Sequence, residues 1–570
     1  MPTKVELDFT RYHKYDELVE ALNRLAAAHP GLARVYSIGR SLDGRDQWLI
    51  EITNEATGPA ADKPAYHING NHHAGEVTGS SVALYTAWYL LSRYGDDQEV
   101  TDLLDTRAFY ILPRIAVDGS EKYLTTPYMI RSSVRLYPDS EAETKDGLYP
   151  EDINGDGKVL TMRVRDDSGE WKVSDGDARL MVRRRPDENG GTYYRLLTEG
   201  LIRNYKEGPF TAAPNRWGVD FNRNYPANWS PEPRQRGAGS FPFSEPEIHN
   251  LARFILEHPN IAGAMSYHTT GGVILRPFAT QSDEKFPPKD LAAYKAIGER
   301  GEEITGYPCW QIWERFTANK GRPEVGSFPE WVYEDLGILA YEIELWDMNT
   351  QAGVPKRDFK GLIELTDKER EEDGLKFLQW NDRELGGRGF TDWAPFDHPQ
   401  LGAVEIGGWD PKFVRQNPPP HLLPGECHKC ARFTLRHAAA SPRLKLAQAK
   451  AERVGGAGSG ASLWKLAVTV ENEGYLPTAV TEMAVSNRRA KPVTAKIALT
   501  AGAELVFGRE KEDLGHLGGR VAAGGAFGGG GVPDNQKMVT WLIKAPAGGE
   551  ATVTVESPRA GKVTREVVLS

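Results

Sequence analysis

The stretch AYHINGNHHAGEVTGSSVALYTAWYLLSRYG, residues 65–95, changes character twice. Its first six residues form a short apolar run of the kind that makes a β-strand. Residues 80–95 are almost continuously apolar and long enough for a buried helix. A second apolar run, FYILPRI (109–115), follows the helix. A strand, a helix and a strand in this order predict an α/β fold, with a mixed, largely parallel sheet flanked by helices.

The same alternation extends over most of the first 395 residues. Apolar residues recur at helical spacing in 14–29, and further helices and strands are predicted at 245–257, 261–270, 289–304 and 338–347. Residues 127–217 interrupt this pattern because they are polar, rich in turn residues and highly charged. We therefore predict one domain over residues 1–395, with a surface insertion at about 127–217 near the mouth of its site.

The C-terminal part of the chain has a different composition. Residues 396–455 contain a short β element and a helical segment, and we expect them to pack on the first domain as an extension. GGAGSGAS (455–462) has the composition of a flexible linker. Several short runs after it alternate apolar and polar residues, which predicts a small all-β sandwich over residues 463–570.

Charge and hydropathy exclude some classes of function. The net charge of −10 argues against a dedicated nucleic-acid binder, which needs a concentrated basic surface. No apolar run approaches the roughly 20 residues of a membrane span, so we expect no membrane partner. The N-terminus lacks the apolar core of a signal peptide. The sequence as it stands therefore predicts a cytoplasmic protein, or a periplasmic or secreted one if a signal peptide was removed.

Four residues at the ends of predicted strands could form a metal site. His73 and Glu76 could supply two ligands from one turn, and His268 could add a third from a distant strand. Each has an alternative interpretation, since short HxxE pairs arise by chance and a lone histidine after a buried strand is usually structural. Glu344 lies in an otherwise apolar strand, where a glutamate is costly unless it is paired or functional. In an α/β sheet such strand ends converge, so the sequence predicts a metal site with a nearby carboxylate.

These residues lie in motifs that resemble those of the zinc metallocarboxypeptidases of the pancreatic carboxypeptidase A family. The resemblance covers about residues 10–390, less the insertion. HAGE is similar to the HxxE of the family, VDFNRNYP to its Asn-Arg pair, and AYEIELWD to the strand that carries its glutamate base. The resemblance implies one Zn²⁺ per chain, bound by His73, Glu76 and His268. It also implies a peptide substrate with a free C-terminal carboxylate.

The resemblance also implies a role for each remaining site residue. Glu344 would take a proton from zinc-bound water and pass it to the leaving amine; it is preferred to Glu342 because Leu345 and Asp347 follow it as in the family. The substrate carboxylate would be held by Asn222 and Arg223, and the scissile carbonyl polarised by Arg131. Asp220 resembles the carboxylate that orients a zinc-bound histidine.

The chain departs from the family pattern at two places. The segment FTANKGRPEV (316–325) has no tyrosine where the family carries its mobile tyrosine, so Lys320 or Arg322 is the alternative for that space. Gly75 replaces the arginine often found inside the HxxE.

Substrate specificity is predicted from a few further residues. Phe328 and Pro329 are expected to line an apolar pocket for the last side chain of the substrate, with Ala279 where basic-specific relatives carry an acid. Arg276 would instead favour an acidic end residue.

A second metal motif lies in the insertion. Asp152, Asn154 and Asp156 match the start of a calcium loop, although position twelve is Arg163 and not an acid. Asp166 or Asp167 could complete the ligands. A solvated turn without Ca²⁺ is the alternative interpretation.

The function predicted from all these features is zinc-dependent removal of C-terminal residues from peptides by glutamate-assisted attack of zinc-bound water. A hydrolase of cell-wall stem peptides with the same fold and a catalytically inactive peptide-binding module are the alternatives. Retention of all three ligands and of Glu344 argues against the inactive module.

Overall fold

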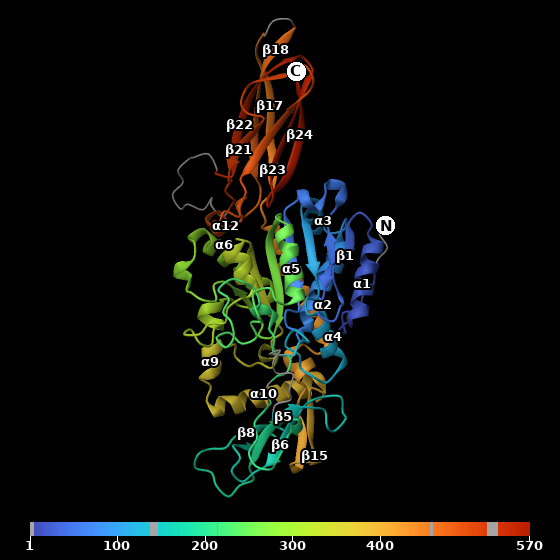
Figure 1. The fold of residues 1–570 in the computed structure, drawn as a ribbon, viewed down its shortest axis with the longest axis vertical. Coiled ribbons are helices and arrows are strands. Elements are labelled where there is room, and N and C mark those ends of the chain that lie inside the picture. The colour runs from blue at the N-terminus through green and yellow to red at the C-terminus, as the bar shows by residue number, and fades with distance from the viewer. Residues whose placement is uncertain (1–4, 137–145, 214, 457–459, 521–533) are drawn as a thin grey trace.

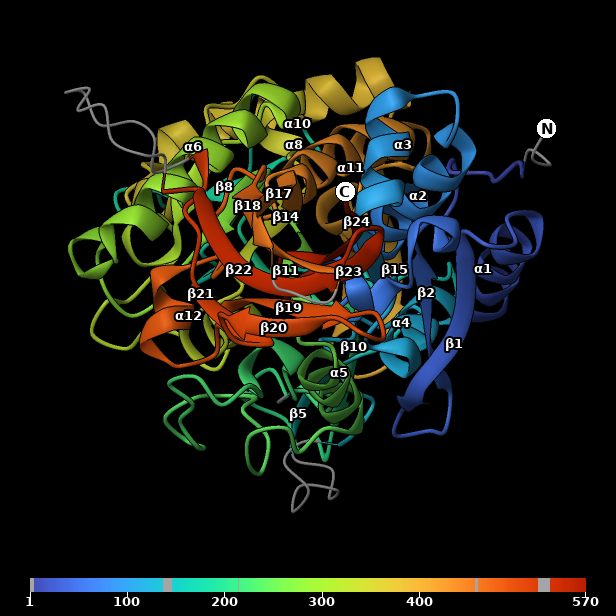
Figure 2. The same cartoon turned by 90° about the horizontal axis from the view of Figure 1, so that it is seen from above.

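The computed structural model describes residues 5–136, 146–213, 215–456, 460–520 and 534–570. The chain forms an elongated molecule with an α/β unit in the middle, a β-sandwich at one end and a smaller sheet at the other (Figure 1). Seen along the long axis, the sandwich lies over the α/β unit (Figure 2). None of the helices in the described ranges is both long enough and apolar enough to span a membrane.

An eight-stranded mixed sheet forms the α/β unit. Its strands, in spatial order, are β1 (Ala33–Arg40), β2 (Asp46–Ile52), β4 (Ala108–Leu112), β3 (Ala65–Gly70), β11 (Ile261–Thr269), β14 (Leu339–Leu345), β12 (Val273–Arg276) and β13 (Cys309–Gln311). The four central strands β4, β3, β11 and β14 are parallel to one another. The predicted α/β fold with a mixed, largely parallel sheet is confirmed.

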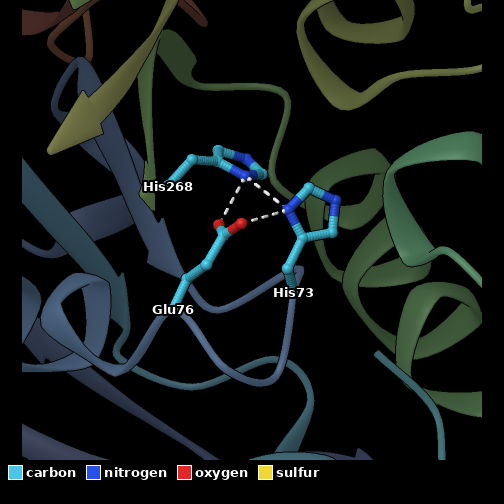
Figure 3. Close-up of side chains that lie close together, drawn as sticks. All are labelled: His73, Glu76 and His268. Atoms are coloured by element: carbon cyan, nitrogen blue, oxygen red, sulfur yellow. Dashed lines mark hydrogen bonds and ion pairs between the residues drawn. The ribbon is translucent and has the colours of Figure 1, made fainter. Parts of the chain in front are cut away.

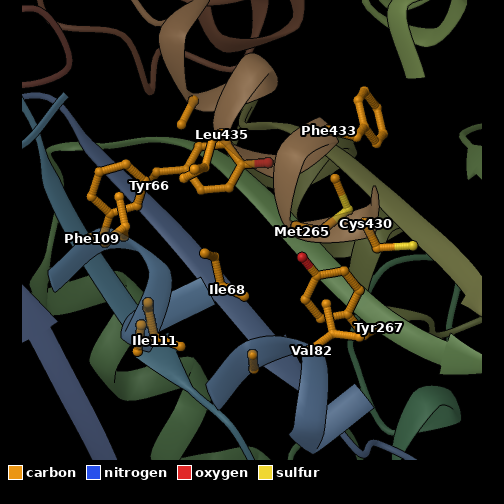
Figure 4. Close-up of a cluster of buried hydrophobic side chains, with 14 of the residues drawn as sticks. Tyr66, Ile68, Val82, Phe109, Ile111, Met265, Tyr267, Cys430, Phe433 and Leu435 are labelled. Carbon is orange, nitrogen blue, oxygen red and sulfur yellow. The ribbon is translucent and has the colours of Figure 1, made fainter. Parts of the chain in front are cut away.

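Helices cover both faces of this sheet, and for that reason its central strands are buried along their whole length. The helices of the unit are α1 (Tyr15–Ala28), α2 (Val77–Arg93), α3 (Gln98–Thr106), α4 (Val117–Thr125), α5 (Pro246–Glu257), α6 (Pro288–Thr305) and α11 (Leu423–Ala439). On one face, Met265 and Tyr267 of β11 lie in one hydrophobic core with Val82 of α2 and with Cys430 and Phe433 of α11 (Figure 4). The sheet thus takes one covering helix from beyond residue 395.

The register of three neighbouring strands sets the position of the site. Strand β11 lies between β3 and β14, and both neighbours run parallel to it. Tyr267 pairs with Gly70, the last residue of β3, and His268 pairs with Glu344 near the end of β14. The segment that follows β3 therefore begins beside His268, at the same edge of the sheet as Glu344.

A second sheet of six antiparallel strands lies beyond this edge. In spatial order it consists of β15 (Phe390–His398), β16 (Gly402–Trp409), β6 (Thr161–Arg165), β9 (Tyr194–Thr198), β7 (Trp171–Val173) and β8 (Met181–Arg183). A separate pair joins β5 (Gly147–Pro150) to β10 (Gly200–Arg203). The predicted insertion at 127–217 is therefore a folded sheet that is completed by residues 390–409. The predicted boundary at 395/396 is wrong because it divides β15, which pairs with β16.

The β-sandwich has two four-stranded antiparallel sheets. One contains β17 (Leu444–Gly456), β18 (Ala461–Asn472), β22 (Gln536–Pro546) and β20 (Glu504–Phe507). The other contains β21 (Lys511–Gly515), β19 (Val493–Leu499), β23 (Gly549–Ser557) and β24 (Gly561–Leu569).

The sandwich begins earlier than the predicted residue 463. Strand β17 pairs with β18 from Leu444 to Gly456, so both glycines at the start of the predicted linker 455–462 belong to a β-ladder. Residues 457–459 lie outside the described residues. The sequence pattern missed β17 because it is an edge strand with mostly exposed side chains, and its apolar alternation is weak.

The sandwich contacts the α/β unit at the amino ends of the parallel strands. The buried Arg559 guanidinium donates hydrogen bonds to the carbonyl oxygens of Leu336 (2.7 Å) and Gly337 (3.0 Å), just before β14 begins. The Oγ1 of Thr481 donates to the same Gly337 carbonyl at 2.7 Å. The remaining helices are α7 (Phe328–Glu330), α8 (Met348–Gln351), α9 (Phe359–Ile363), α10 (Asp367–Leu385) and α12 (Glu482–Ser486).

The position of β17 predicts how fragments of the sandwich behave. Fragment 443–570 keeps every strand, and we expect it to unfold cooperatively on heating. Fragment 463–570 lacks β17, which leaves β18 paired only with β22 and uncovers the core around Leu466, so we expect no cooperative transition. Circular dichroism of both fragments during heating tests this expectation. Equal melting temperatures for the two fragments would contradict it.

Candidate metal centre

The turn between β3 and α2 carries two of the predicted ligands. The strand ends at Gly70 and the helix begins at Val77, and their ends are in contact: a Cβ on Gly70 would lie 2.6 Å from the carbonyl carbon of Gly79. Asn71 adopts a positive φ of 61°, and its amide donates hydrogen bonds to the carbonyl oxygens of His73 (3.1 Å) and Ala74 (3.3 Å). These contacts bend the turn back over the sheet.

Three of the predicted site residues meet at this turn. Glu76 Oε1 lies 2.8 Å from His73 Nδ1, and Glu76 Oε2 lies 3.1 Å from His268 Nδ1 (Figure 3). The two Nδ1 atoms lie 3.2 Å apart, and all three side chains are buried. Ligand atoms of a tetrahedral Zn²⁺, at about 2.1 Å from the ion, are separated by about 3.4 Å. Two imidazole nitrogens and one carboxylate at these separations form a donor set that fits zinc and leaves one coordination position open.

The charges of this cluster depend on one another. Burial disfavours the ionised form of Glu76, but the imidazoles of His73 and His268 outweigh burial and lower its pKa to about 2. Burial also disfavours the protonated form of His268, but the carboxylates of Glu342 and Glu76 raise its pKa well above the ordinary value. A cation is therefore stabilised at this point, and a metal ion there would take the place of a bound proton.

Asp220 lies behind His73, as predicted. Its Oδ1 is 3.1 Å from His73 Nε2, and its Oδ2 accepts hydrogen bonds from Nε (2.9 Å) and Nη2 (2.7 Å) of Arg131. Burial opposes ionisation of Asp220, but Arg131 and His73 hold its pKa well below the usual range. Arg131 also reaches the ligand cluster directly, with Nη1 at 3.8 Å from Glu76 Oε1.

Glu342 lies behind His268 in a corresponding place, which the sequence analysis did not assign. Its Oε1 is 3.3 Å from His268 Nε2 and accepts a 2.9 Å hydrogen bond from Asn222 Nδ2. The signal for this residue was present in the sequence, since Glu342 and Glu344 share one face of β14. Each imidazole of the cluster is thus backed by its own carboxylate.

Glu344 is the carboxylate without a partner. It pairs in register with His268, and its Oε2 is buried with no hydrogen-bond partner in the part of the chain that the structure describes. Burial, followed by the nearby charges of Glu76 and Glu342, raises its pKa to about 8. Above this pKa Glu344 is an unpaired carboxylate beside the metal-binding cluster and can accept a proton.

Asn222 and Arg223 follow Asp220 in a short 3₁₀ turn, Phe221–Arg223. Asn222 uses its Oδ1 to accept a 2.8 Å hydrogen bond from the Phe328 amide and gives one amide hydrogen to Glu342, which leaves one for a ligand. The Arg223 Nη1 donates to the Asn222 carbonyl at 2.8 Å, and its Nη2 pairs with the exposed carboxylate of Glu324.

The comparison with known proteins decides the family. A sequence model described as zinc carboxypeptidase matches residues 18–369, more than half of the chain. The chain belongs to the zinc carboxypeptidase family. A second family, described as a domain of unknown function, matches residues 443–568 and so begins close to β17.

Curated relatives of the family match short segments. Carboxypeptidase D of Anas platyrhynchos is 34% identical over 116 residues, which are 20% of this chain and 8% of that protein. Carboxypeptidase Z of Homo sapiens is 35% identical over 124 residues, which are 21% of this chain and 19% of that protein. The chain thus spans a small part of the length of these relatives.

Solved structures of the family cover more of the chain at lower identity. The crystal structure of thrombin activatable fibrinolysis inhibitor matches with a TM-score of 0.39 and 18% identity, and covers 65% of this chain and 74% of that one. Carboxypeptidase A from Helicoverpa armigera has the same TM-score of 0.39 and 18% identity, and covers 68% and 75%.

The predicted specificity pocket differs from the structure. Phe328 is fully buried and packs against Tyr225, His72 and Trp331, so it belongs to the core and does not line an open pocket. Arg276 forms a two-point contact with Asp283, at 2.6 and 2.7 Å, and is not free to select an acidic end residue. The local sequence pattern indicated neither contact. Phe328 packs against Tyr225, which is distant in the sequence, and Arg276 meets Asp283 only because the chain turns back between them.

The two departures from the family pattern have physical reasons in the structure. Arg322 donates hydrogen bonds to the backbone carbonyls of Pro233 (2.6 Å) and Arg234 (2.8 Å), and Lys320 pairs with Glu314 at 2.6 Å. Both cations therefore hold the surface loop and do not point to the metal cluster. Gly75 is enclosed by side chains of α4 and of the segment before α11.

A Cβ on Gly75 would lie 2.7 Å from Gln416 Oε1 and 2.8 Å from Tyr123 Cε2. The space beside Gly75 is thus filled by Tyr123 and by Gln416, a residue beyond the family match.

The predicted calcium loop lies at the surface between β5 and β6. Asp152 Oδ1 accepts a hydrogen bond from the Gly155 amide and Oδ2 accepts one from the Gly157 amide, both at 2.8 Å. Asn154 and Asp156 accept similar bonds from the Asp156 and Lys158 amides, both at 2.9 Å. Glu199 Oε1 also accepts a 2.9 Å hydrogen bond from the Ile153 amide, and Ca²⁺ binding to the loop stays a prediction.

Zinc binding to the cluster predicts a change in stability. A ligand that binds the folded chain alone, at about a hundredfold excess over its Kd, stabilises the fold by about 2.7 kcal/mol. We expect Zn²⁺ to raise the melting temperature of the chain after chelator treatment, and His268→Ala to abolish this rise. His258→Ala is the control, because His258 stacks on Phe254 at 3.9 Å within the same unit. A rise that survives in His268→Ala would place the zinc elsewhere.

Proposed function

We propose that the protein is a zinc-dependent carboxypeptidase that hydrolyses the last peptide bond of peptides with a free C-terminal carboxylate. One observation carries this proposal: the cluster of His73, Glu76 and His268 lies beside an unpartnered carboxylate, Glu344, at one edge of a parallel sheet. Membership of the zinc carboxypeptidase family supports the same reaction.

The zinc ligands proposed are His73 Nδ1, Glu76 and His268 Nδ1. A zinc ion held there would polarise the scissile carbonyl and lower the pKa of water to about 7. Asp220 and Glu342 keep the two imidazoles in orientation through the Nε2 atoms, because they lie 3.1 and 3.3 Å from them.

Glu344 is the proposed general base. Its carboxylate accepts a proton from the attacking water while the water oxygen bonds to the carbonyl carbon, and it then gives that proton to the leaving amine as the C–N bond breaks. Arg131 stabilises the negative charge that develops on the carbonyl oxygen, a role that suits a guanidinium oriented by Asp220 and close to the ligand Glu76.

Arg223 is the proposed anchor of the substrate carboxylate. Its guanidinium already pairs with one carboxylate, that of Glu324, which stands on an exposed loop. A substrate carboxylate would take the place of Glu324, and the free amide hydrogen of Asn222 would add a second donor. The proposed enzyme therefore recognises the end of a chain and not its interior.

Replacing the proposed base should remove turnover and leave the metal. In Glu344→Gln the side chain keeps its shape but cannot accept the proton, so kcat should fall by about 10²- to 10⁴-fold. Zinc content, measured by metal analysis of the same preparation, should stay at one ion per chain. Wild-type turnover in this variant would refute the assigned role.

Replacing the anchor should change the preference for free carboxylates. In Arg223→Ala the KM for a peptide acid should rise roughly 10- to 100-fold, the equivalent of about 1.5–3 kcal/mol for a charged hydrogen bond, while the amide of the same peptide is affected little. Arg322→Ala is the matched control, because that arginine binds backbone carbonyls of the surface loop.

Mass spectrometry of a mixed library of peptide acids and peptide amides, after incubation with the protein, measures which of the two kinds of substrate is cleaved. Trimmed ends among the acids are expected. Cleavage confined to peptides that end in D-configured or diamino acids would favour a cell-wall stem-peptide hydrolase, and binding without cleavage would favour an inactive module.

A further inference from the structure

A short segment beyond the family match contacts the metal-ligand turn. It is the π-helical stretch Pro411–Gln416 with the following Asn417, between β16 and α11. The family match ends at residue 369, so this segment lies outside the matched residues. Asp410 begins it, accepting hydrogen bonds from the amides of Lys412 and Phe413, both at 2.9 Å.

Asn417 bonds to the backbone on both sides of Glu76. Its side chain is fully buried. The Nδ2 donates to the carbonyl oxygen of Gly75 at 2.8 Å, and the Oδ1 accepts from the amide of Thr78 at 3.1 Å and from its hydroxyl at 2.8 Å. One amide side chain thus spans the turn that carries the ligand.

The start of α2 explains why this contact matters. Glu76 is the N-cap residue of the helix, yet its side chain makes no capping hydrogen bond because it is turned to the two imidazoles. An N-cap side chain ordinarily accepts a hydrogen bond from the second or third amide of the helix, which would otherwise lack a partner. Thr78 is the second helical residue, and Asn417 Oδ1 accepts its amide hydrogen. Asn417 therefore caps the helix in place of Glu76.

Lys412 binds the neighbouring part of the site from the same segment. Its buried Nζ donates to the carbonyl oxygens of Tyr123 and Thr126, both at 2.5 Å, at the end of α4. The chain runs from there to Arg131, whose carbonyl accepts a 2.7 Å hydrogen bond from the Ala74 amide in the ligand turn. The segment 411–417 thus holds the ligand turn and the arm that carries Arg131.

We propose that residues 411–417 are a brace for the metal site and that Asn417 is a positioning residue, which caps α2 from outside so that the Glu76 carboxylate stays free to bind the metal. The proposal rests on the proposed zinc site. Without Asn417, the amides at the start of α2 and the metal would compete for the Glu76 carboxylate. The Gly75 carbonyl would also lose its hydrogen-bond donor.

Zinc affinity of the full chain tests this brace. In Asn417→Leu, which keeps a similar volume but no hydrogen bond, the Kd for Zn²⁺ measured by competition with a chromophoric chelator should rise about 10- to 100-fold. Asn417→Asp keeps the acceptor for the Thr78 amide, so it should recover most of the affinity. Where leucine is not accommodated and the chain does not fold, Asn417→Ala takes its place.

Asn260→Ala is the control for a general loss of stability. Asn260 is buried in the same α/β unit, at the opposite ends of the strands, and its amide donates to the carbonyls of Ala60 and Lys63, both at 2.9 Å. Its zinc affinity should equal that of the wild type even where its melting temperature falls.

Two results would overturn the brace. One is wild-type zinc affinity in the folded leucine or alanine variant, and the other is an equal loss of affinity in Asn260→Ala. If the wild-type chain itself bound no zinc, the proposed function would fail first, so the two failures are distinguishable.

Discussion

The parallel register of β3, β11 and β14 is the constraint on which the rest of the site depends. It pairs His268 with Glu344 on the neighbouring strand. The turn that carries His73 and Glu76 begins at the same edge of the sheet, where β3 ends. Because the three strands are buried along nearly their whole length, a slip of one residue would move apolar side chains out of the core as well as the ligands out of the cluster. The packing that stabilises the sheet therefore also specifies the geometry of the site.

Concentrating so many ionisable groups at one buried edge requires compensation. Asp220 is paired with Arg131 and His73, and Glu342 with His268 and Asn222, so each of these carboxylates has a cation or a donor beside it. Glu344 is the exception, and its raised pKa reflects burial without such a partner. A raised pKa of this kind is expected at a buried group that is proposed to accept a proton. The paired carboxylates Asp220 and Glu342 are thus distinguished by their contacts from Glu344, the proposed base.

The sequence pattern predicted the parts of the molecule that depend on local periodicity and on short motifs. Apolar runs of β3 and β11 indicated the buried parallel sheet, and the motif residues at their ends are the ones that the structure brings together. It missed β17, whose exposed edge carries little apolar signal.

The features that remained hidden from the sequence depend on partners far along the chain. Phe328 was predicted to line a pocket but lies in the core, because Tyr225 and His72 pack against it. Asn417 was missed because nothing in its neighbourhood points to a turn more than 300 residues earlier.

Two imidazoles and one carboxylate are proposed to bind a single zinc ion at the edge of the sheet. X-ray diffraction from crystals of the zinc-loaded chain, with data on both sides of the zinc absorption edge, would locate that ion. We expect one anomalous peak per chain, at about 2.0–2.2 Å from His73 Nδ1, His268 Nδ1 and a Glu76 oxygen. A peak held by other residues, or none between these three, would contradict it.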